Sequence, residues 1–519
     1  ELSGKIFFRL KINRDATEKL WHGGTFVPSY ISRSGDVLDP MTPFFALFLT
    51  FFFLRSAESL GFGAAEAVDH EAWNRLQILG RISDAQDGTL QRTFLSLGSR
   101  RAMATVENWM IRAGLDTWVD EIGNVHGRIE GAGCVRHKVL LFGSHLDTVK
   151  DAGKYDGALG ILVGLAAVKA LVLESITGME PVPCSLQLVA SSDEEGVRFS
   201  STFLGSRALV GTLPDNVFKA QDNEGHTFLE ALWQNGFKGT LESIQTANIS
   251  DVLASYIEVH IEQGPVLQQM KQHASPVVGI SGQTRLLFTV HGTQGHAGTV
   301  PMTERKDALA ASADIIHAIE TYCRERVLTT SRDNLLVCTV GAVSVWPGSS
   351  NVIPSSTNFT VDIRSKSDSD RNVVVEHVIE YAQHVCRTRG LIFSFDRTHD
   401  APAVDCDDQI INNFAESILH VTKDLTGTQD SVDVAISDLW SDSGSFNIKN
   451  TKYQHALTSG AGHDALAISQ ACPIGMLFVR CKDGISHSPQ EHSTPEDVAF
   501  AGRVLLDFLQ SDGALFSAL

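Results

Sequence analysis

From residue 65 onward, apolar strand-like runs alternate with helix-like segments, and this alternation constrains the fold more than any other feature of the sequence. Residues 139–142 form one apolar run, residues 161–173 are rich in Leu, Val and Ala with helical character, and residues 185–190 form the next run. Such an alternation is typical of an α/β sheet. We therefore expect an α/β fold in which a central mixed sheet is flanked by helices.

Between residues 276 and 397 the pattern changes to that of a smaller α+β unit. The expected elements are a strand at 285–292, a helix at 305–324, strands at 335–345 and 358–364, a helix at 373–387 and a strand at 391–396. Beyond residue 400 the first pattern returns, with a strand at 475–480 and an amphipathic helix at 495–509. We expect one α/β domain, split between residues 65–275 and 398–519 and interrupted by a smaller α+β domain at 276–397.

The N-terminal segment has the pattern of a secretory signal. Residues 1–40 show no amphipathic period and are assigned no fold, whereas residues 44–54 form an apolar run that leads into small residues near Ala57. This order predicts a signal peptide at residues 41–62 and export to the secretory pathway, with the endoplasmic reticulum as the expected location. The natural chain would then start at Met41, and residues 1–40 would come from an over-extended gene model. The alternative is a buried or interfacial segment of an N-terminal extension.

Composition limits the kinds of molecule that this chain is expected to bind. The apolar run is shorter than the roughly 20 residues of a membrane-spanning helix, so no permanent membrane anchor is expected. A formal charge of -19 argues against general binding to nucleic acid or anionic membranes and favours a small-molecule substrate.

The eight cysteines include no C-x-x-C pair, which excludes a disulfide scaffold and a zinc ribbon. Asn248 and Asn358 stand in glycosylation sequons.

Polar residues with metal-binding side chains follow the run at 139–142. His145 and Asp147 form an H-x-D pair, and Asp156 follows in Lys-Tyr-Asp-Gly. A neutral imidazole is a good metal ligand, and a carboxylate beside it fixes the direction of the ring, which is the role predicted for Asp147. A carboxylate can also give one oxygen to each of two dications about 3.5 to 4 Å apart. Asp156 is the candidate for that bridge.

Three further clusters follow strand-like runs. Glu194 and Glu195 are adjacent, and successive residues of an extended chain point in different directions, so one can bind metal while its neighbour faces substrate. His260 ends another run, and His487 lies near the C-terminus. Taken singly, each motif is compatible with a solvated or structural role. Together, these His and carboxylate side chains predict a site for zinc, manganese or cobalt.

Ten motifs in fixed order resemble the binuclear-metal amidohydrolases of the aminoacylase/carboxypeptidase superfamily. The resemblance spans roughly residues 70–512, and within the superfamily it is greatest to the allantoate amidohydrolases of plants. The motifs are, in order, G-S-H-L-D-T-V, K-Y-D-G, S-D-E-E-G-V-R-F, E-V-H-I-E-Q-G-P-V-L, G-Q-T-R, G-H-A-G-T-V-P-M, N-V-I-P, D-I-R-S, S-G-A-G-H-D-A and G-I-S-H-S-P.

The resemblance implies roles for the candidate His, Asp and Glu residues described above. The implied ligands are His145, Asp156 and His260 for one metal ion and Asp156, Glu195 and His487 for the other, with Glu194 as general base. It further implies that the split domain is catalytic and that the domain at 276–397 forms dimers and closes over the site. Two manganese ions are the implied cofactors, although the spacing itself does not separate manganese from zinc.

Hydrolysis of a ureide needs a hydroxide at neutral pH, and a metal-bound water whose pKa falls toward about 7 supplies it. Glu194 is expected to accept the proton of that water and to pass it to the leaving nitrogen. His296, in Gly-His-Ala-Gly, is the expected donor to the tetrahedral oxyanion. The resemblance implies that His296 reaches the active site of the other subunit of a homodimer.

Allantoate has one carboxylate and two ureido arms, so its site needs a cationic clamp and several amide-type partners. Arg364 is the candidate clamp, and Gln283 and Asn351 can each donate to and accept from a ureido group. Gly462 and His463, in a glycine-rich loop, are further candidate contacts. The products implied by the resemblance are ureidoglycine, ammonia and carbon dioxide.

Several alternatives stay open at this point. Ureidoglycolate amidohydrolases and N-carbamoyl-L-amino-acid hydrolases share most of these motifs, and a non-catalytic binding protein or a conventional dipeptidase-like metal enzyme could use the same fold. Glu194 argues against a pure binding protein, which would need metal ligands but no proton acceptor. Residues 430–456 form a longer connection than expected, either a surface loop or a misannotated exon boundary.

Overall fold

The computed structural model describes residues 64–131, 137–177, 182, 184–329, 335–426 and 456–511. The unassigned residues 1–40, the signal peptide expected at 41–62 and nearly all of the connection at 430–456 lie outside the described residues.

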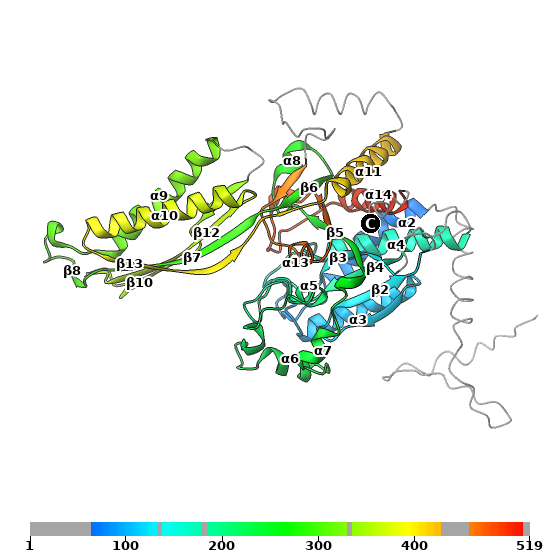
Figure 1. Cartoon of the computed structure of the whole chain (residues 1–519), viewed down its shortest axis with the longest axis horizontal. Coiled ribbons are helices and arrows are strands. Elements are labelled where there is room, and N and C mark those ends of the chain that lie inside the picture. Colours follow the sequence, from blue (N-terminus) through cyan, green and yellow to red (C-terminus); the bar gives the residue numbers. More distant parts are fainter. Residues whose placement is uncertain are drawn as a thin grey trace, which may run out of the picture. The chain divides into compact units, whose positions relative to one another are not determined.

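A nine-stranded mixed sheet forms the larger part of the fold (Figure 1). β3 is parallel to its neighbours β4 and β5, and β16 is parallel to β5 but antiparallel to β6. The strand order is β1 (Asp116–Val119), β2 (Val125–Ile129), β4 (Leu186–Ser191), β3 (Val139–His145), β5 (Leu253–Ile261), β16 (Ile474–Val479), β6 (Ala274–Ile280) and β14 (Val404–Asp405), with β15 (Leu457–Ser459) also on β6. The central strands are buried along their whole length, as expected for a sheet covered on both faces.

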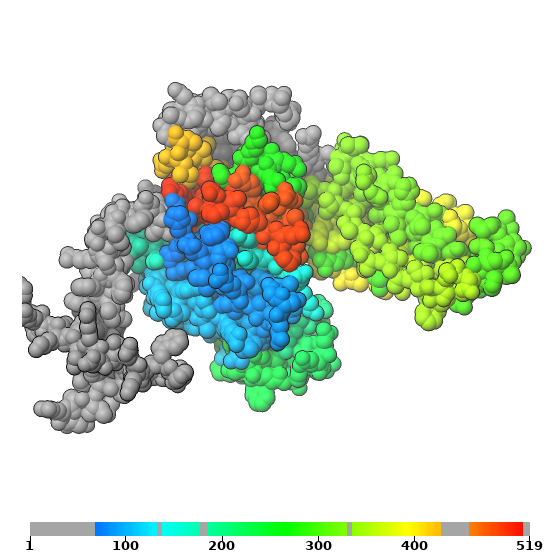
Figure 2. Space-filling view, turned by 180° about the vertical axis from the view of Figure 1, so that it is seen from behind, coloured from blue at the N-terminus to red at the C-terminus, as the bar shows by residue number. Residues whose placement is uncertain are grey.

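Helices supply the two apolar cores that cover this sheet. One core joins it to α2 (Ala64–Leu79), α3 (Leu97–Arg112), α4 (Ala158–Thr177), α11 (Asp408–Thr426) and α14 (Pro495–Gln510). A second core includes residues of α5 (Leu204–Leu209), α8 (Val266–Met270) and α13 (Asp464–Ile468). The helices α6 (Phe228–Gln234) and α7 (Leu241–Gln245) add a smaller apolar cluster. Chain segments from both ends meet here, since Arg503 of α14 pairs with Asp69 of α2, and the two helices lie side by side in Figure 2.

α4 also has the length and apolarity of a membrane-spanning helix. Its window Ala158–Ile176 has a mean hydropathy of 2.1, and 67% of that window is buried inside the protein. Among the residues that the structure describes, it is the one helix with these properties. Its contacts with β3 and β5 are those of a helix packed in a protein core.

A separate five-stranded antiparallel sheet lies between β6 and β14 in the chain. Its order is β10 (Val343–Trp346), β12 (Ser356–Ser365), β7 (Gly282–His291) and β13 (Ile392–Ala401), with β9 (Leu336–Thr339) also on β12. β7 and β12 alternate buried with less buried residues, because one face of the sheet packs under α9 (Ala308–Thr329) and α10 (Asp368–Thr388). Figure 1 shows both helices on the same face.

The expected α/β fold with a smaller inserted sheet is confirmed. The single strand predicted at 335–345 is wrong, because β9 and β10 are two strands that pair with different parts of β12. The domain boundaries at 276 and 397 stay predictions. The chain passes from the larger sheet to the smaller one between Ile280 and Gly282, and it returns between Ala401 and Val404.

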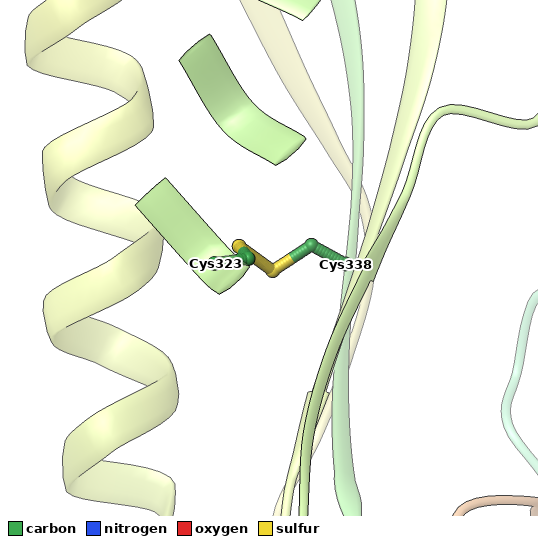
Figure 3. The surroundings of a disulfide bond; sticks show 2 residues. All are labelled: Cys323 and Cys338. Atoms are coloured by element: carbon green, nitrogen blue, oxygen red, sulfur yellow. A yellow bond between two sulfur atoms is a disulfide. The ribbon is translucent and has the colours of Figure 1, made fainter. Parts of the chain in front are cut away.

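A disulfide bond joins Cys323 of α9 to Cys338 of β9 (Figure 3). It closes a loop between residues that are 15 positions apart and ties the helix layer of the smaller sheet to one of its strands. The sequence left the redox state of the cysteines open. A disulfide is typical of proteins that fold in an oxidising compartment.

Candidate active site

Four neighbouring strands bring the predicted metal ligands together. The order β4-β3-β5-β16 is continuous in the sheet, and these four strands are mutually parallel. His145 is the last residue of β3, His260 is near the end of β5, and His487 comes in the loop after β16. Glu194 and Glu195 follow β4. The carboxyl ends of parallel strands meet at one edge, where open α/β sheets bind ligands.

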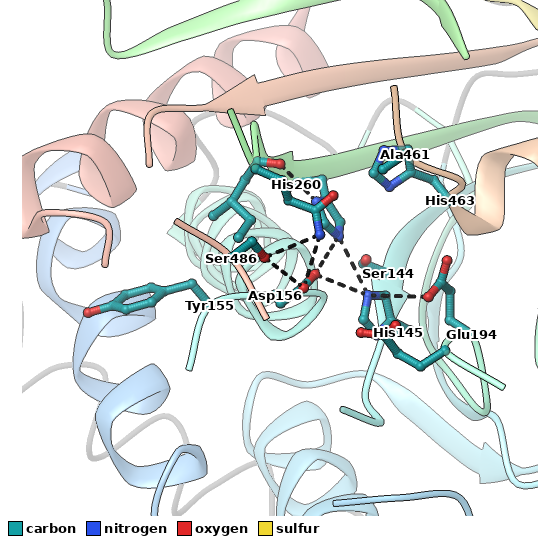
Figure 4. Close-up of polar contacts among 12 residues, drawn as sticks. Ser144, His145, Tyr155, Asp156, Glu194, His260, Ala461, His463 and Ser486 are labelled. Atoms are coloured by element: carbon teal, nitrogen blue, oxygen red, sulfur yellow. Dashed lines mark hydrogen bonds and ion pairs between the residues drawn. The ribbon is translucent and has the colours of Figure 1, made fainter. Parts of the chain in front are cut away.

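The carboxylate of Asp156 lies beside the side chains of His145 and His260 (Figure 4) and also contacts His487. Its Oδ1 is 3.1 Å from His260 Nε2 and 3.5 Å from His145 Nε2. Its Oδ2 is 3.1 Å from Nε2 of His487, which in turn lies 3.4 Å from Glu195 Oε1. The two oxygens of Asp156 therefore face two different groups of ligand atoms, as a bridging carboxylate requires.

The residues present fit two divalent ions. Ligand atoms bound to one ion at about 2.0 to 2.2 Å lie roughly 3 to 3.5 Å apart, and the distances around Asp156 are of this size. Asp156 Oδ1 and Glu195 Oε1 are buried oxygens without a hydrogen bond. A buried oxygen in this state costs free energy unless a cation or donor meets it. Groups of His, Asp and Glu with mutual distances up to 4.8 Å include both of the expected ligand sets.

Two carboxyl groups of the site differ in their titration. Burial raises the pKa of Asp156, but its close contacts with the imidazoles of His145, His260 and His487 outweigh burial and hold its pKa well below its usual value. Burial raises the pKa of Glu194 well above the ordinary value, and the positive charge of a protonated His145 opposes this rise. Asp156 is thus held as an anion, whereas Glu194 is able to take up a proton. Glu194 Oε2 lies 4.0 Å from His145 Nε2.

Asp147 has a different partner from the one expected. Its carboxylate is 3.8 Å from His145 Nδ1, too far for a hydrogen bond, and the ring nitrogen lies instead 3.1 Å from the main-chain oxygen of Asp147. The carboxylate accepts hydrogen bonds from the main-chain N–H groups of Glu194 at 3.0 Å and Glu195 at 3.2 Å. Asp147 therefore orients the two glutamates.

Three polar residues near Asp156 received no role from the sequence. Gln263 Nε2 and Ser486 Oγ donate to Asp156 Oδ2 at 3.0 and 3.1 Å. The buried Glu491 accepts hydrogen bonds from the main-chain N–H groups of Tyr155 and Asp156 at 2.8 and 3.0 Å. Gln263 and Ser486 belong to the quoted motifs and could have been flagged by their position beside a ligand. Glu491 follows His487 by four residues, and no pattern links it to residue 156.

Two of the predicted substrate residues lie on the smaller sheet. Gln283 of β7 and Arg364 of β12 both donate to the carboxylate of Asp362, and Arg364 Nη1 also donates to the main-chain oxygen of Gly460 at 2.8 Å. A cavity of about 510 Å³ opens beside Arg364, and it is lined by Arg285, Leu286, Val337, Thr339, Gly341, Thr360, Val361, Asp362, Arg364, Thr398 and Gly460. The structure thus places a guanidinium group at the wall of a cavity near the loop that carries His463.

His463 stands beside the metal cluster. Its ring centre is 4.5 Å from that of His260, and its Nε2 is 2.7 Å from Ser459 Oγ. Burial lowers the pKa of His463 well below its ordinary value, so the ring is neutral and can donate or accept one hydrogen bond. A Cβ at Gly462 would come within 2.6 Å of the Phe203 ring, so any other residue there would require that ring to move.

His296 and Asn351 are neighbours away from the cluster. β8 (Gly295–His296) pairs with β11 (Val352–Ile353), and the main-chain N–H of Ala297 donates to the oxygen of Asn351 at 3.0 Å. His296 is exposed. Within the described ranges, no hydrogen bond or ion pair joins His296 or Asn351 to the candidate metal ligands.

This chain is similar in sequence and in structure to several known proteins. Residues 141–511 match the model of the peptidase family M20/M25/M40. The chain is 42% identical to an allantoate deiminase of Arabidopsis thaliana over 476 residues, 87% of this chain and 86% of that protein. It is 36% identical to an N-carbamoyl-L-amino-acid amidohydrolase of Pseudomonas sp. (strain NS671), over 83% and 95% of the two chains. A crystal structure of an amidase of the hydantoinase/carbamoylase family from Burkholderia multivorans is similar with a TM-score of 0.70 and 26% identity, covering 85% and 96%.

Proposed function

The chain belongs to the peptidase family M20/M25/M40, and on that premise we propose that it is a metal-dependent amidohydrolase that hydrolyses allantoate. One observation carries the proposal: the two oxygens of Asp156 face two different sets of ligand atoms beside a buried Glu194. Similarity to an allantoate deiminase at 42% identity supports the substrate. The expected products are ureidoglycine, ammonia and carbon dioxide.

Each residue of the site has a separate role in the proposed reaction. Bound divalent ions supply Lewis acidity, lowering the pKa of a water toward about 7 and polarising the ureide carbonyl. Glu194 accepts the proton of the attacking water at its carboxylate and returns it to the leaving nitrogen. Asp147 holds the main chain of Glu194 so that its side chain faces the cluster. Burial of Glu194 excludes bulk water from this proton transfer.

The substrate is anchored through its carboxylate and its ureido arms. The planar guanidinium of Arg364 matches a carboxylate, and the amide of Gln283 matches the N–H and C=O edges of a ureido group. In the structure both side chains bond to Asp362, so substrate has to compete with that carboxylate or displace it. Asn351, Gly462 and His463 are the other proposed contacts.

The active enzyme is a homodimer in which His296 donates to the oxyanion in the other subunit. Two observations support this arrangement: His296 is exposed, and within the part of the chain that the structure describes it has no contact with the cluster of its own chain. Mixing an inactive His296→Ala chain with an inactive Glu194→Gln chain is the test. Partial recovery of activity supports the arrangement, and a mixture without activity contradicts it.

We further propose that the metal site binds manganese and that the protein is located in the endoplasmic reticulum. The apolar run at 44–54 and the disulfide between Cys323 and Cys338 support an oxidising compartment. Asn248 and Asn358 are exposed in their sequons, so a glycosidase-sensitive mass increase would follow from secretion. A reporter fused to residues 41–65 that stays in the cytosol would contradict this location. Metal analysis of the protein from its source cell tests manganese against zinc.

Ammonia release by the purified dimer decides the substrate. The protein with added manganese is offered allantoate, ureidoglycolate and an N-carbamoyl-L-amino acid in parallel, and allantoate is expected to turn over fastest. The second candidate is hydrolysis of an N-carbamoyl-L-amino acid, which the similarity to such an enzyme at 36% identity favours. Preference for that compound would keep the metal site and replace the substrate.

A further inference from the structure

Glu491 joins two loops that carry metal ligands from opposite ends of the sequence. Its Oε1 accepts hydrogen bonds from the main-chain N–H groups of Tyr155 at 2.8 Å and Asp156 at 3.0 Å. Its Oε2 accepts a hydrogen bond from Ser486 Oγ at 2.9 Å, and Ser486 directly precedes His487. One buried side chain therefore holds the main chain at Asp156 and the residue before His487.

Through Ser486, the hydrogen bonds of Glu491 also reach a candidate metal-ligand atom of Asp156. Ser486 Oγ lies 3.1 Å from Asp156 Oδ2 and 2.9 Å from Glu491 Oε2. A dashed line in Figure 4 marks the contact between Ser486 and Asp156. The single hydroxyl proton of Ser486 is thus shared between the carboxylates of Asp156 and Glu491, and Asp156 is also held at its backbone by Glu491. Asp156 Oδ2 and His487 Nε2 are 3.1 Å apart, and the contacts through Ser486 and Glu491 join the two loops that carry these atoms.

The surroundings are shaped for the Glu491 carboxylate. A side chain at Gly153 would come within 2.2 Å of Glu491 Cδ and Oε1, so the loop before Asp156 has a glycine where it passes the carboxylate. Glu491 N–H donates to the main-chain oxygen of Ser488 at 3.0 Å, which closes the turn after His487. His487 itself has φ of 54°, an unfavourable conformation for a non-glycine residue that its surroundings must maintain.

We propose that Glu491 is a positioning residue that fixes the distance between Asp156 and His487 and thereby sets the affinity for the metal ion that they share. The inference rests on the metal site of the proposed function, but it concerns binding of the ion and not the substrate. Residues that orient metal ligands typically change metal affinity by about 10- to 100-fold when they are replaced. The other ion, held by His145, His260 and Oδ1 of Asp156, has two of its three ligands on β3 and β5, so Asp156 is the one ligand that it has in common with this connection.

Two substitutions separate the hydrogen bonds from the charge. Glu491→Gln keeps an amide oxygen for the two main-chain N–H groups, and its amide N–H can donate to Ser486 Oγ, so the connection survives without the charge. Glu491→Ala removes the connection. Asp407→Ala is the matched control, because Asp407 Oδ1 also accepts two main-chain N–H groups, from Gln409 and Ile410 at 2.9 and 3.1 Å. Asp407 lies between β14 and α11, and its main-chain N–H donates to the oxygen of Ile474 at the start of β16, whereas His487 follows the end of that strand.

The test counts bound manganese. Full-length protein loaded with Mn²⁺ is dialysed against a series of buffered free Mn²⁺ concentrations, and bound metal and thermal unfolding are both measured. In Glu491→Ala, one of the two ions should dissociate at a free Mn²⁺ concentration about 10- to 100-fold higher than in the wild type. Glu491→Gln and Asp407→Ala should retain both ions within about threefold of the wild type, although Asp407→Ala lowers the melting temperature.

Three outcomes would overturn the proposal. Glu491→Ala could bind both ions as the wild type does, Asp407→Ala could lose the same ion, or Glu491→Gln could be as weak as Glu491→Ala. If Glu491→Ala does not fold, Ser486→Ala replaces it, because that variant removes only the Oε2 half of the connection; wild-type binding in Ser486→Ala would then also overturn the proposal. Wild-type protein that binds no divalent ion would instead refute the metal site of the proposed function, and a substrate other than allantoate would leave the metal measurement unaffected.

Discussion

His145 Nδ1 lies 3.1 Å from the main-chain oxygen of Asp147, whereas the nearest carboxylate oxygen of Asp147 is 3.8 Å from the same nitrogen. Because a carbonyl oxygen only accepts, Nδ1 carries a proton, which leaves Nε2 as the ring nitrogen that can bind a metal ion. The ring is oriented by the backbone, which leaves the carboxylate free to orient the loop that follows β4.

Replacing Asp147 by Asn tests this division. The amide can accept from one main-chain N–H, of Glu194 or Glu195, but its NH₂ group would face the other, so the loop loses part of its support. We expect kcat to fall by about 10- to 100-fold while both metal ions remain bound. Metal content and kcat are measured on the same preparation. Loss of the ion held by His145 would show that the carboxylate does orient the ring.

Glu194→Gln should abolish most turnover without loss of metal. A general base contributes about 10²- to 10⁴-fold to the rate, and the amide cannot accept the proton. The neighbouring Glu195→Gln is the control, since it should release the ion that His487 shares, as metal analysis would detect. If Glu194→Gln loses metal to the same extent as Glu195→Gln, the separate roles of the two glutamates are wrong.

Arg364→Ala should raise KM for allantoate by at least about tenfold, because a hydrogen-bonded ionic contact contributes roughly 1.5 to 3 kcal/mol. Arg364→Lys should recover little, since it lacks the planar fork. Arg324→Ala is the control: Arg324 lies on α9 and pairs with Glu320 on the exposed surface. Steady-state kinetics with allantoate measure the effect, and an unchanged KM in Arg364→Ala would remove this residue from substrate binding.

Replacing both Cys323 and Cys338 by Ser should lower the free energy of unfolding by about 2 to 4 kcal/mol. The bond closes a loop between residues 15 positions apart, and its removal gives the unfolded chain more conformations. Denaturant unfolding of the double variant measures the loss. Ser at the free, buried Cys386 is the control for burying a hydroxyl group; an equal loss there would assign the effect to packing.

The stability of the metal-free protein should fall as pH rises through about 7. Burial, with help from Asp464, raises the pKa of Glu258 from 4.5 to about 7. A carboxyl group whose pKa is higher in the folded state stabilises the fold below its unfolded pKa, and this contribution is lost as pH rises through the folded value. Glu258→Gln keeps a partner for Ser144 Oγ and should flatten the decline. Urea unfolding at about pH 5 and pH 8 compares the two proteins, and parallel declines would contradict the assignment.

The sequence alone predicted the buried central strands and the candidate residues at their ends. The apolar runs that became β3, β4, β5 and β16 are recognisable because strands buried on both faces need continuous apolar residues. Side chains that follow such strands at their carboxyl ends must gather at one edge of the sheet, so His145, Glu194 and His260 could be assigned to one site before any distance was known.

Only the tertiary structure decided which atoms meet. The main-chain partner of His145 and the link from Glu491 to Asp156 depend on φ, ψ and side-chain rotamers in loops, where no periodicity constrains the chain. Glu491 and Asp156 are 335 positions apart, and hydrogen bonds over such a separation arise from how the strands are ordered in the sheet. Residue types near strand ends follow from local pattern, whereas their mutual geometry follows from the packing of the whole domain.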